Sequence, residues 1–243
     1  MTTTASLLAR KVFELSRSLR AELPIPRGAQ FYGLDHDMPY PVEVLQVLSA
    51  QGIFRKYEFV LELESGFGGR ARWAARQFGC QVLGVEPDEK AAQVAQALGK
   101  YAGELSQAVF CRGGLEALPF RSGAFTHVWW LWPRSAVEPR KCLREAHRVL
   151  RDGGYFAWVV GWEGEASRQA ERQLREVGFV ITEKRRLEVG RPNPWFALAR
   201  RRFEQAIREV PELHNVWSGR VQEWVEGACL ALLFARRGTK HEQ

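Results

Sequence analysis

The stretch from residue 59 to residue 78 constrains the fold more than any other part of the chain. It begins with an apolar run over 59–63, passes through the closely spaced Gly66, Gly68 and Gly69, and continues with apolar residues at helical spacing over 69–78. This pattern predicts a strand, a tight turn and a helix. Glycines in such a turn let the backbone approach a ligand, and the start of the helix presents free N–H groups.

A second apolar run, 81–86, ends in the acid Glu86, about 20 residues past the glycine turn. An acid at this spacing binds a ribose hydroxyl in dinucleotide-binding βαβ units. A purely structural turn is the alternative, because many α/β turns contain a glycine pair after a strand. The glycines, the helix and the acid together favour a nucleotide-like ligand.

Further apolar runs extend this rhythm along the chain. We expect strands at 108–111, 125–132 and 155–160, with helices between most of them, and this alternation predicts a parallel, doubly wound α/β sheet. Helices are expected at 3–21 and 41–52 before the sheet. After it we expect a helix at 165–177, a strand at 179–187, two helical patches within 195–226 around Pro211, and a last strand at 228–235.

Composition limits the class of protein. The chain has 243 residues, 46% hydrophobic content and a net charge of +7, which suit one α/β domain with an elaboration. Its arginine clusters are short and scattered, so solvated faces are favoured over a nucleic-acid surface. The four cysteines contain no CxxC and are interpreted as reduced core residues. With no secretory signal or membrane-spanning run in the sequence, we expect a cytoplasmic protein.

The segment Asp35-His36-Asp37 raises the question of a metal site. Adjacent residues point in different directions, and no further ligands stand at a useful spacing. A solvated loop is therefore favoured over a metal site, and no metal is expected. A flap that closes over a bound ligand remains the alternative.

Four segments occur in an order and spacing typical of one family: 61–68, 84–87, 113–120 with 125–129, and 143–154. By them the chain resembles class I S-adenosylmethionine-dependent methyltransferases of the small-molecule type, over roughly residues 40–190 and the final strand. The resemblance implies a Rossmann-like, seven-stranded, mostly parallel sheet with a reversed last strand. Its ligand would lie across the C-terminal ends of the first four strands, as is general for open α/β sheets.

We expect the chain to divide into four parts. Residues 1–40 would be an N-terminal helix and lid, 41–190 the Rossmann core, 191–226 a helical insertion that caps the substrate, and 227–243 the last strand and tail. S-adenosylmethionine would be the cofactor, S-adenosylhomocysteine the product, and a small molecule the acceptor. An ordinary helical appendage or a homodimer contact remains an alternative for the insertion.

The resemblance points to nine residues of the cofactor site: Glu62, Glu64, Gly66, Gly68, Glu86, Pro87, Gly114, Leu115 and Trp130. In these roles the two loop glycines would allow backbone approach and Glu86 would bind both ribose hydroxyls. Leu115 with Gly114 would meet the adenine edge. Glu62 is expected to organise the glycine loop rather than take part in chemistry.

Three positions depart from the family pattern. Glu64 stands where glycine is usual, beside the methionyl part of the cofactor, and would either pair with the cofactor's positive charge, fill the pocket, or need backbone angles that suit glycine. Gly114 replaces an aspartate that contacts adenine, and Trp130 replaces a small polar residue. These departures support an alternative, a methyltransferase-like protein that has lost activity and serves as a binding or partner subunit.

A catalytic residue is not assigned. His127 lies inside an expected strand and is interpreted as structural, and His147 is expected at the surface of an arginine-rich helix. Trp129 and Trp132, with Trp130, would line the substrate side in part, with core packing expected for at least one of the three. A nicotinamide-dependent oxidoreductase is a weaker alternative, because Gly66-x-Gly68-x-x-Ala71 also fits that fingerprint.

Overall fold

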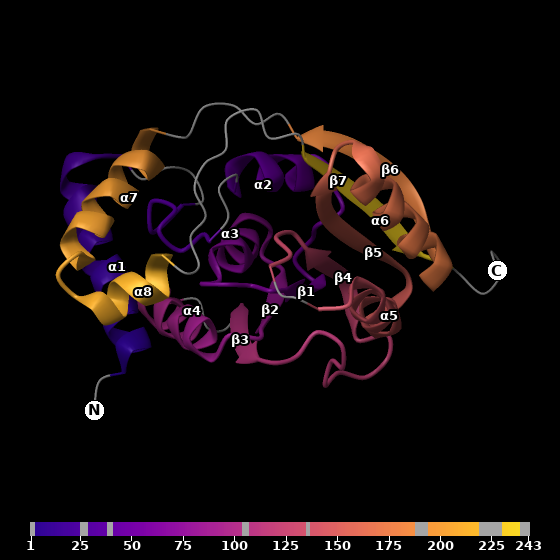
Figure 1. The fold of residues 1–243 in the computed structure, drawn as a ribbon, viewed down its shortest axis with the longest axis horizontal. Coiled ribbons are helices and arrows are strands. Elements are labelled where there is room, and N and C mark those ends of the chain that lie inside the picture. The colour runs from indigo at the N-terminus through magenta and orange to yellow at the C-terminus, as the bar shows by residue number, and fades with distance from the viewer. Residues whose placement is uncertain are drawn as a thin grey trace.

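The computed structural model describes residues 3–24, 29–37, 41–103, 107–134, 137–187, 194–218 and 230–238. Its centre is a seven-stranded sheet in the order β3-β2-β1-β4-β5-β7-β6 (Figure 1). The strands are β1 (Phe59–Leu63), β2 (Gln81–Glu86), β3 (Ala108–Arg112), β4 (Phe125–Trp130), β5 (Leu150–Gly161), β6 (Phe179–Leu187) and β7 (Leu230–Arg237). Strand β7 runs antiparallel to both neighbours. The predicted seven-stranded Rossmann-like sheet with a reversed last strand is confirmed.

Eight helices accompany the sheet in the described residues. They are α1 (Thr4–Glu22), α2 (Pro41–Ser49), α3 (Gly69–Phe78), α4 (Glu89–Ala102), α5 (Pro139–Val149), α6 (Gly164–Val177), α7 (Pro194–Ile207) and α8 (Pro211–Ser218). Helices α2 and α3 share one hydrophobic cluster with the sheet. This cluster also includes Ala95 of α4. Helices α5 and α6 share a second cluster with the opposite face. The sheet is therefore covered on both faces, as a parallel sheet requires.

Local sequence signals explain where several of these elements begin. The Asp88 side chain accepts the N–H of Ala91 at 3.0 Å and caps α4, as expected for an acid before a helix. Pro139 starts α5, where its missing N–H costs nothing. Gly68 precedes α3 with φ of +80°, a left-handed conformation that glycine adopts without strain.

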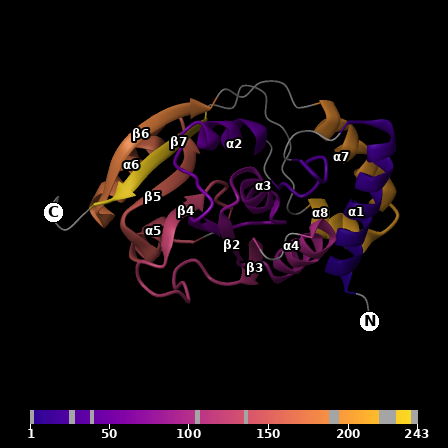
Figure 2. The same ribbon diagram turned by 180° about the vertical axis from the view of Figure 1, so that it is seen from behind.

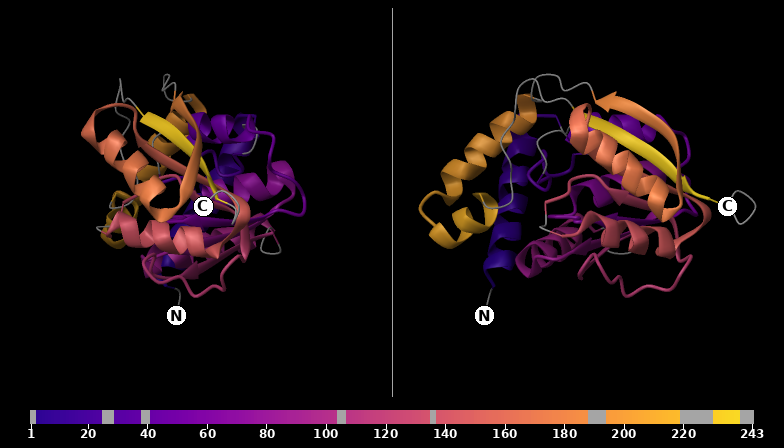
Figure 3. Two further views of the ribbon diagram at one scale, coloured as in Figure 1. Left: turned by 90° about the vertical axis from the view of Figure 1, so that its right-hand side faces the viewer. Right: turned by 45° about the vertical axis from the view of Figure 1, so that its right-hand side comes forward.

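The remaining helices gather at the β3 end of the molecule. Helices α1, α7 and α8 with residues 29–37, here named the helical lobe, share a hydrophobic cluster with α4 and with Phe67 of the glycine loop. Figures 1 and 2 show α1, α7 and α8 at one end of the molecule and β6 and β7 at the other. The chain thus leaves the sheet after β6 at one edge and adds α7 and α8 beside the opposite edge, next to α4 (Figure 3).

A few expected boundaries were wrong. Strand β4 ends at Trp130 rather than residue 132, and β5 begins at Leu150, five residues before the expected start. The Asp152-Gly153-Gly154 turn signal falls inside β5, where Leu150 pairs with Phe125 and a register shift follows. The residues before the turn therefore join the sheet despite the glycines, because pairing with β4 outweighs local turn propensity.

Three of the four cysteines lie in the described residues. Cys80, Cys111 and Cys142 are free thiols, and burial raises the pKa of Cys142 to about 12. Cys229 lies outside the described residues. Within the described ranges, none of the helices combines the length and apolar character that crossing a bilayer requires.

Candidate functional site

The parallel register brings the predicted site residues to one edge of the sheet. Glu62 in β1 lies between Gly84 of β2 and Trp129 of β4. Glu64 directly follows β1, and Glu86 and Trp130 are the last residues of β2 and β4, so all three reach the same carboxyl edge. Ligands of open α/β sheets bind at this edge.

The glycine loop is tied to the end of β2 by Glu86. One carboxylate oxygen of Glu86 accepts the Gly66 N–H at 2.8 Å, and the other accepts the Asp88 N–H at 2.9 Å. Glu86 is buried, with 1% of its surface exposed. The two loop glycines are sterically required: a Cβ on Gly68 would come within 2.4 Å of Phe110, and one on Gly66 within 2.1 Å of Asp37 Oδ2.

The carboxylate of Glu64 binds the end of β4 and the segment that follows it. Its Oε2 accepts the indole N–H of Trp130 at 2.7 Å and the backbone N–H of Arg134 at 2.9 Å. Its backbone has φ of +53°, a conformation that costs about 1–2 kcal/mol for a residue with a Cβ. Of the outcomes expected at this position, the need for glycine-like backbone angles is confirmed.

Arg70, in the first turn of α3, joins three parts of the site. Its Nε donates to Glu62 Oε1 at 2.5 Å, its Nη1 to Asp37 Oδ1 at 2.7 Å and its Nη2 to the carbonyl oxygen of Glu64 at 2.9 Å. Burial raises the pKa of Glu62, against the lowering effect of Arg70. Glu62 thus holds Arg70, which in turn holds the glycine loop, in agreement with the organising role expected for this acid.

The segment 35–37 is buried, so the expectation of a solvated loop was wrong. Asp35, His36 and Asp37 expose 4%, 5% and 1% of their surfaces. The carbonyl of Asp35 accepts the Gly69 N–H at 3.0 Å, and burial lowers the pKa of His36 to about 4. Tertiary contacts with the start of α3 bury this polar segment, which places it over the glycine loop as the flap alternative requires.

Arg72 anchors the same segment from the next position along α3. It donates to Asp35 Oδ2 at 3.0 Å and to the carbonyl oxygen of Phe67 at 2.5 Å. Its guanidinium also lies over the rings of Phe31 and Phe110, at 5.6 and 5.4 Å from their centroids. In the described residues no group of three or more His, Cys, Asp or Glu side chains has the geometry of a metal site.

Three further predicted site residues are Gly114, Leu115 and Pro87. Gly114 is exposed, and a Cβ placed on it would meet nothing within 4 Å. Leu115 is buried in the core with Val128 and Trp130, and Pro87 is half-buried beside Glu86. The adenine contact of Gly114 and Leu115 stays a prediction.

The aromatic and histidine candidates belong mainly to the core. Trp129 and Trp130 are both buried, and Trp130 stacks on Trp158 with centroids 5.4 Å apart. His127 pairs with Val60 early in β1, far from the carboxyl edge, and burial lowers its pKa to about 3. His147 is half-buried against Phe179, so its expected surface position was wrong, because α5 turns it toward β6.

Sequence reasoning missed Asp37, Arg70 and Arg134. Arg134 Nη1 lies 3.7 Å from Asp37 Oδ2, and its backbone N–H binds Glu64. Only Arg70 had a local signal, because a cation in the first turn of α3 opposes the helix dipole and therefore needs acidic partners. Asp37 stands 29 residues before Gly66 in the sequence, and nothing local indicates the contact.

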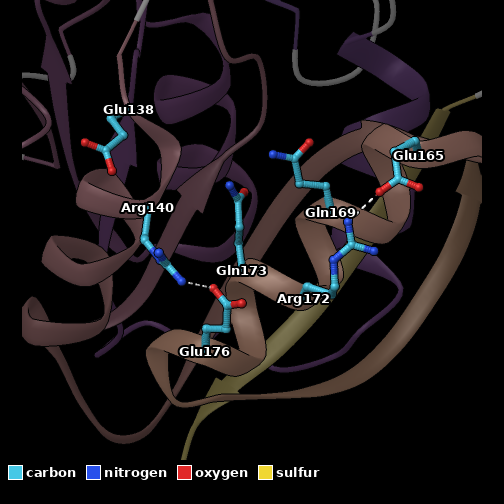
Figure 4. Close-up of a pocket in the computed structure, with 7 residues that line it drawn as sticks. All are labelled: Glu138, Arg140, Glu165, Gln169, Arg172, Gln173 and Glu176. Atoms are coloured by element: carbon cyan, nitrogen blue, oxygen red, sulfur yellow. Dashed lines mark hydrogen bonds and ion pairs between the residues drawn. The ribbon is translucent and has the colours of Figure 1, made fainter.

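A hollow lies away from the glycine loop. It measures about 500 Å³ and lies between the start of α5 and α6, and Figure 4 shows the side chains that line it. Its lining is entirely charged or amide: Glu138, Arg140, Glu165, Gln169, Arg172, Gln173 and Glu176. Arg140 of α5 pairs with Glu176 of α6 across it, and Arg172 pairs with Glu165 along α6. None of the predicted site residues reaches this hollow.

Comparison with known proteins gives a family for the centre of the chain. A profile described as a methyltransferase domain matches residues 61–158. The sarcosine/dimethylglycine N-methyltransferase of Halorhodospira halochloris is 31% identical over 105 residues, which are 42% of this chain and 37% of that relative. The match thus spans little more than a third of the curated relative.

Solved structures share the fold at low identity. The cyclase SpnF has a TM-score of 0.62 and 21% identity, over 81% of this chain and 82% of that chain. Geranyl diphosphate C-methyltransferase from Streptomyces coelicolor A3(2) has a TM-score of 0.59 and 16% identity, over 80% and 77%. Residues 61–158 thus match a methyltransferase domain, and these solved structures share the fold of the seven-stranded sheet.

Proposed function

We propose that this chain transfers a methyl group from S-adenosylmethionine to a small-molecule acceptor. The observation that carries the proposal is the buried carboxylate of Glu86 at the end of β2, bonded to the Gly66 N–H at 2.8 Å. By the resemblance to methyltransferases, Glu86 would bind the ribose diol. The matched domain and the methyltransferase relatives support the same activity.

The residues present fit such a cofactor. A carboxylate can accept about four hydrogen bonds. The bonds from Gly66 and Asp88 therefore do not by themselves use the full acceptor capacity of the Glu86 carboxylate. Gly66 and Gly68 carry no side chains, and Asp37 and Phe110 lie on the faces where their Cβ atoms would be. Glu64 directs its carboxylate to Trp130. Glu64 and Trp130, which depart from the family pattern, thus satisfy each other, and no comparison supports an inactive partner subunit.

The chemistry needs little from the protein beyond placement. The cofactor supplies a methyl group that a positively charged sulfur already activates. The chain would hold the nucleoside through Glu86 and the loop backbone, and residues 35–37 would cover the start of α3. Alignment of donor and acceptor can contribute about 7–11 kcal/mol to lowering such a barrier.

The acceptor is proposed only as a small molecule. The relatives named above act on unlike compounds, an amino acid derivative in one case and geranyl diphosphate in another. The helical lobe packs beside α4 and β3 and reaches the glycine loop through Phe67. A cap over the acceptor formed by residues 1–40 and 191–226 therefore stays part of the proposal.

Calorimetric titration with S-adenosylmethionine, S-adenosylhomocysteine and NADH tests the function. The wild type should bind the first two and not NADH. Glu86→Gln removes the charge and one acceptor oxygen, and should weaken both by about 10- to 100-fold, because a hydrogen bond to a charged group contributes about 1.5–3 kcal/mol. Glu89→Gln, three residues on and exposed, is the matched control.

The thermal melting of Glu86→Gln must be followed alongside, because this variant also loses one of its bonds to Gly66 and Asp88. Wild-type protein that binds neither methyl donor nor thioether, or that binds NADH instead, would overturn the proposal. Unchanged affinity in Glu86→Gln would show that Glu86 does not bind the ribose.

A further inference from the structure

Another hollow lies where the chain leaves β5 and enters α6. Its volume is about 370 Å³, which falls within the range of about 300–1,000 Å³ typical of small-molecule sites. It stands beyond the carboxyl end of β5, three strands along the sheet from β2 and Glu86, so it is separate from the predicted cofactor site. The residues that line it come from the β5–α6 connection, α6 and β6: Trp162, Glu163, Gly164, Ser167, Arg168 and Lys184.

The ammonium group of Lys184 is held in place by α6 and by the indole of Trp162. Its Nζ donates to Ser167 Oγ at 2.7 Å and to Glu171 Oε1 at 3.1 Å, and it lies 5.2 Å from the centroid of the Trp162 ring. An ammonium group has three donors, so these two bonds leave one hydrogen for a further acceptor. The Lys184 side chain is 29% exposed, so a ligand in the hollow can reach it.

Ser167 supplies a second donor next to Lys184. Only 1% of its surface is exposed, and its oxygen accepts the Lys184 N–H. A hydroxyl that accepts in this way still carries a hydrogen of its own to donate. Among the described residues this hydrogen has no acceptor, and burying a donor without an acceptor is unfavourable. A ligand oxygen in the hollow would remove that penalty.

Arg168 supplies a third set of donors. Its Nε donates to Glu165 Oε2 at 3.1 Å, which leaves the two terminal nitrogens of the guanidinium group for another partner. Both cations of the lining have acidic partners, since Lys184 also pairs with Glu171. The preference of the hollow therefore follows from the donors that these pairs leave uncommitted and not from a surplus of positive charge.

The lining fits a phosphate joined to a hydroxylated ring. Donors from three side chains match the three terminal oxygens of a phosphate monoester, and the fixed fork of an arginine suits phosphate in particular. Trp162 adds a half-buried indole, on which the apolar face of a sugar ring can pack. Glu163 is the one side chain of the lining that is solely an acceptor, and sugar hydroxyls are donors.

We propose that this hollow is a binding site for a sugar phosphate. The phosphate lies on Lys184, Ser167 and Arg168, and the sugar ring packs on Trp162 with a hydroxyl toward Glu163. The site goes beyond the proposed methyl transfer and does not depend on it.

Calorimetric titration of the full chain with glucose 6-phosphate tests the site, with inorganic phosphate and glucose as partial ligands. The wild type should bind glucose 6-phosphate more tightly than either partial ligand. Lys184→Gln should weaken this binding by about 10- to 100-fold, because it replaces a charged donor with a neutral one. Arg185→Gln is the matched control, since it removes the same charge from the next residue of β6, pairs with Glu183 and does not line the hollow.

Two further variants separate the halves of the ligand. Trp162→Leu should weaken glucose 6-phosphate and leave inorganic phosphate unchanged, because it removes only the surface on which the ring packs. Arg168→Gln, at an exposed position, should weaken both, and it supplies the comparison if Lys184→Gln fails to fold.

Losses confined to the variants of the lining support the site. Wild-type protein that does not bind glucose 6-phosphate at millimolar concentration, an equal loss in Arg185→Gln, or unchanged affinity in Trp162→Leu overturns it. These outcomes are measured without S-adenosylmethionine, so none of them decides the proposed function, which its own titration tests.

Discussion

At the scale of single residues, Glu64 shows how an unfavourable backbone is tolerated. Its left-handed conformation costs about 1–2 kcal/mol, yet its carboxylate satisfies two donors at the end of β4, the Trp130 indole and the Arg134 N–H. Hydrogen bonds to a charged acceptor are about twice as strong as neutral ones. The Glu64 side chain therefore offsets the strain of its own backbone.

A three-variant series at position 64 separates these effects. Glu64→Gln keeps one carbonyl oxygen, and both donors bind a single oxygen of Glu64, so the loss of unfolding free energy should stay within about 1.5 kcal/mol. Glu64→Ala leaves two donors without acceptors, at about 1–3 kcal/mol each. Glu64→Gly should be about 1 kcal/mol more stable than Glu64→Ala, because glycine tolerates positive φ. Urea unfolding measures all three, and an alanine variant as stable as the glycine variant would contradict the account.

At the scale of elements, the helical lobe is joined to the glycine loop by aromatic packing. Phe67 stacks on Trp217 of α8 with centroids 6.0 Å apart, and Trp217 packs on Phe203 of α7 at 4.6 Å. Phe67 is fully buried. The glycine loop thus uses its one large side chain, Phe67, to anchor α7 and α8.

Trp217→Ala should loosen the lobe while leaving the sheet intact. Truncating a buried aromatic side chain costs about 3–5 kcal/mol, and the loss should appear as faster amide hydrogen exchange in α1, α7 and α8. Strands β1, β2 and β4 should exchange as in the wild type. Arg202→Ala, which removes an exposed pair with Glu22, is the control and should change little. Uniform acceleration through the sheet would show that the lobe and the core unfold as one unit.

At the scale of the whole molecule, buried histidines link stability to pH. Burial lowers the pKa of His127 to about 3, below its unfolded value of 6.5. The folded state therefore keeps this ring neutral while the unfolded state binds a proton. The stability from His127 is fully present above pH 6.5 and is lost as pH falls toward 3. Burial of His36 acts in the same direction, and burial of Glu62 acts in the opposite one.

His127→Phe isolates this contribution. Phenylalanine keeps the ring packing with Phe54 and Tyr155 and removes the titrating group. Between pH 6 and pH 4 the unfolding free energy of wild type should fall more steeply than that of the variant, by up to about 1.4 kcal/mol per pH unit. Urea unfolding at several pH values measures this, with pH 8 as the reference. Parallel curves would show that His127 does not titrate on unfolding.

The sequence by itself determined the sheet and the ligand edge. Strands β1, β2 and β6 and helix α3 lie within the predicted residues, because hydrophobic periodicity and glycine or proline punctuation are local signals. The position of Glu86 beside the glycine turn followed from spacing alone, since strand, turn and helix lengths fix where a strand ends.

Only the tertiary structure decided what covers that edge. Three contacts join residues far apart in the chain. Asp37 lies against Gly66, Arg70 donates hydrogen bonds to both Glu62 and Asp37, and Trp217 packs on Phe67. No local pattern encodes these contacts, because burial of a polar segment depends on which partners the completed fold brings to it. The sequence of residues 35–37 indicates a solvated loop, and two arginines of α3 make it a buried part of the site.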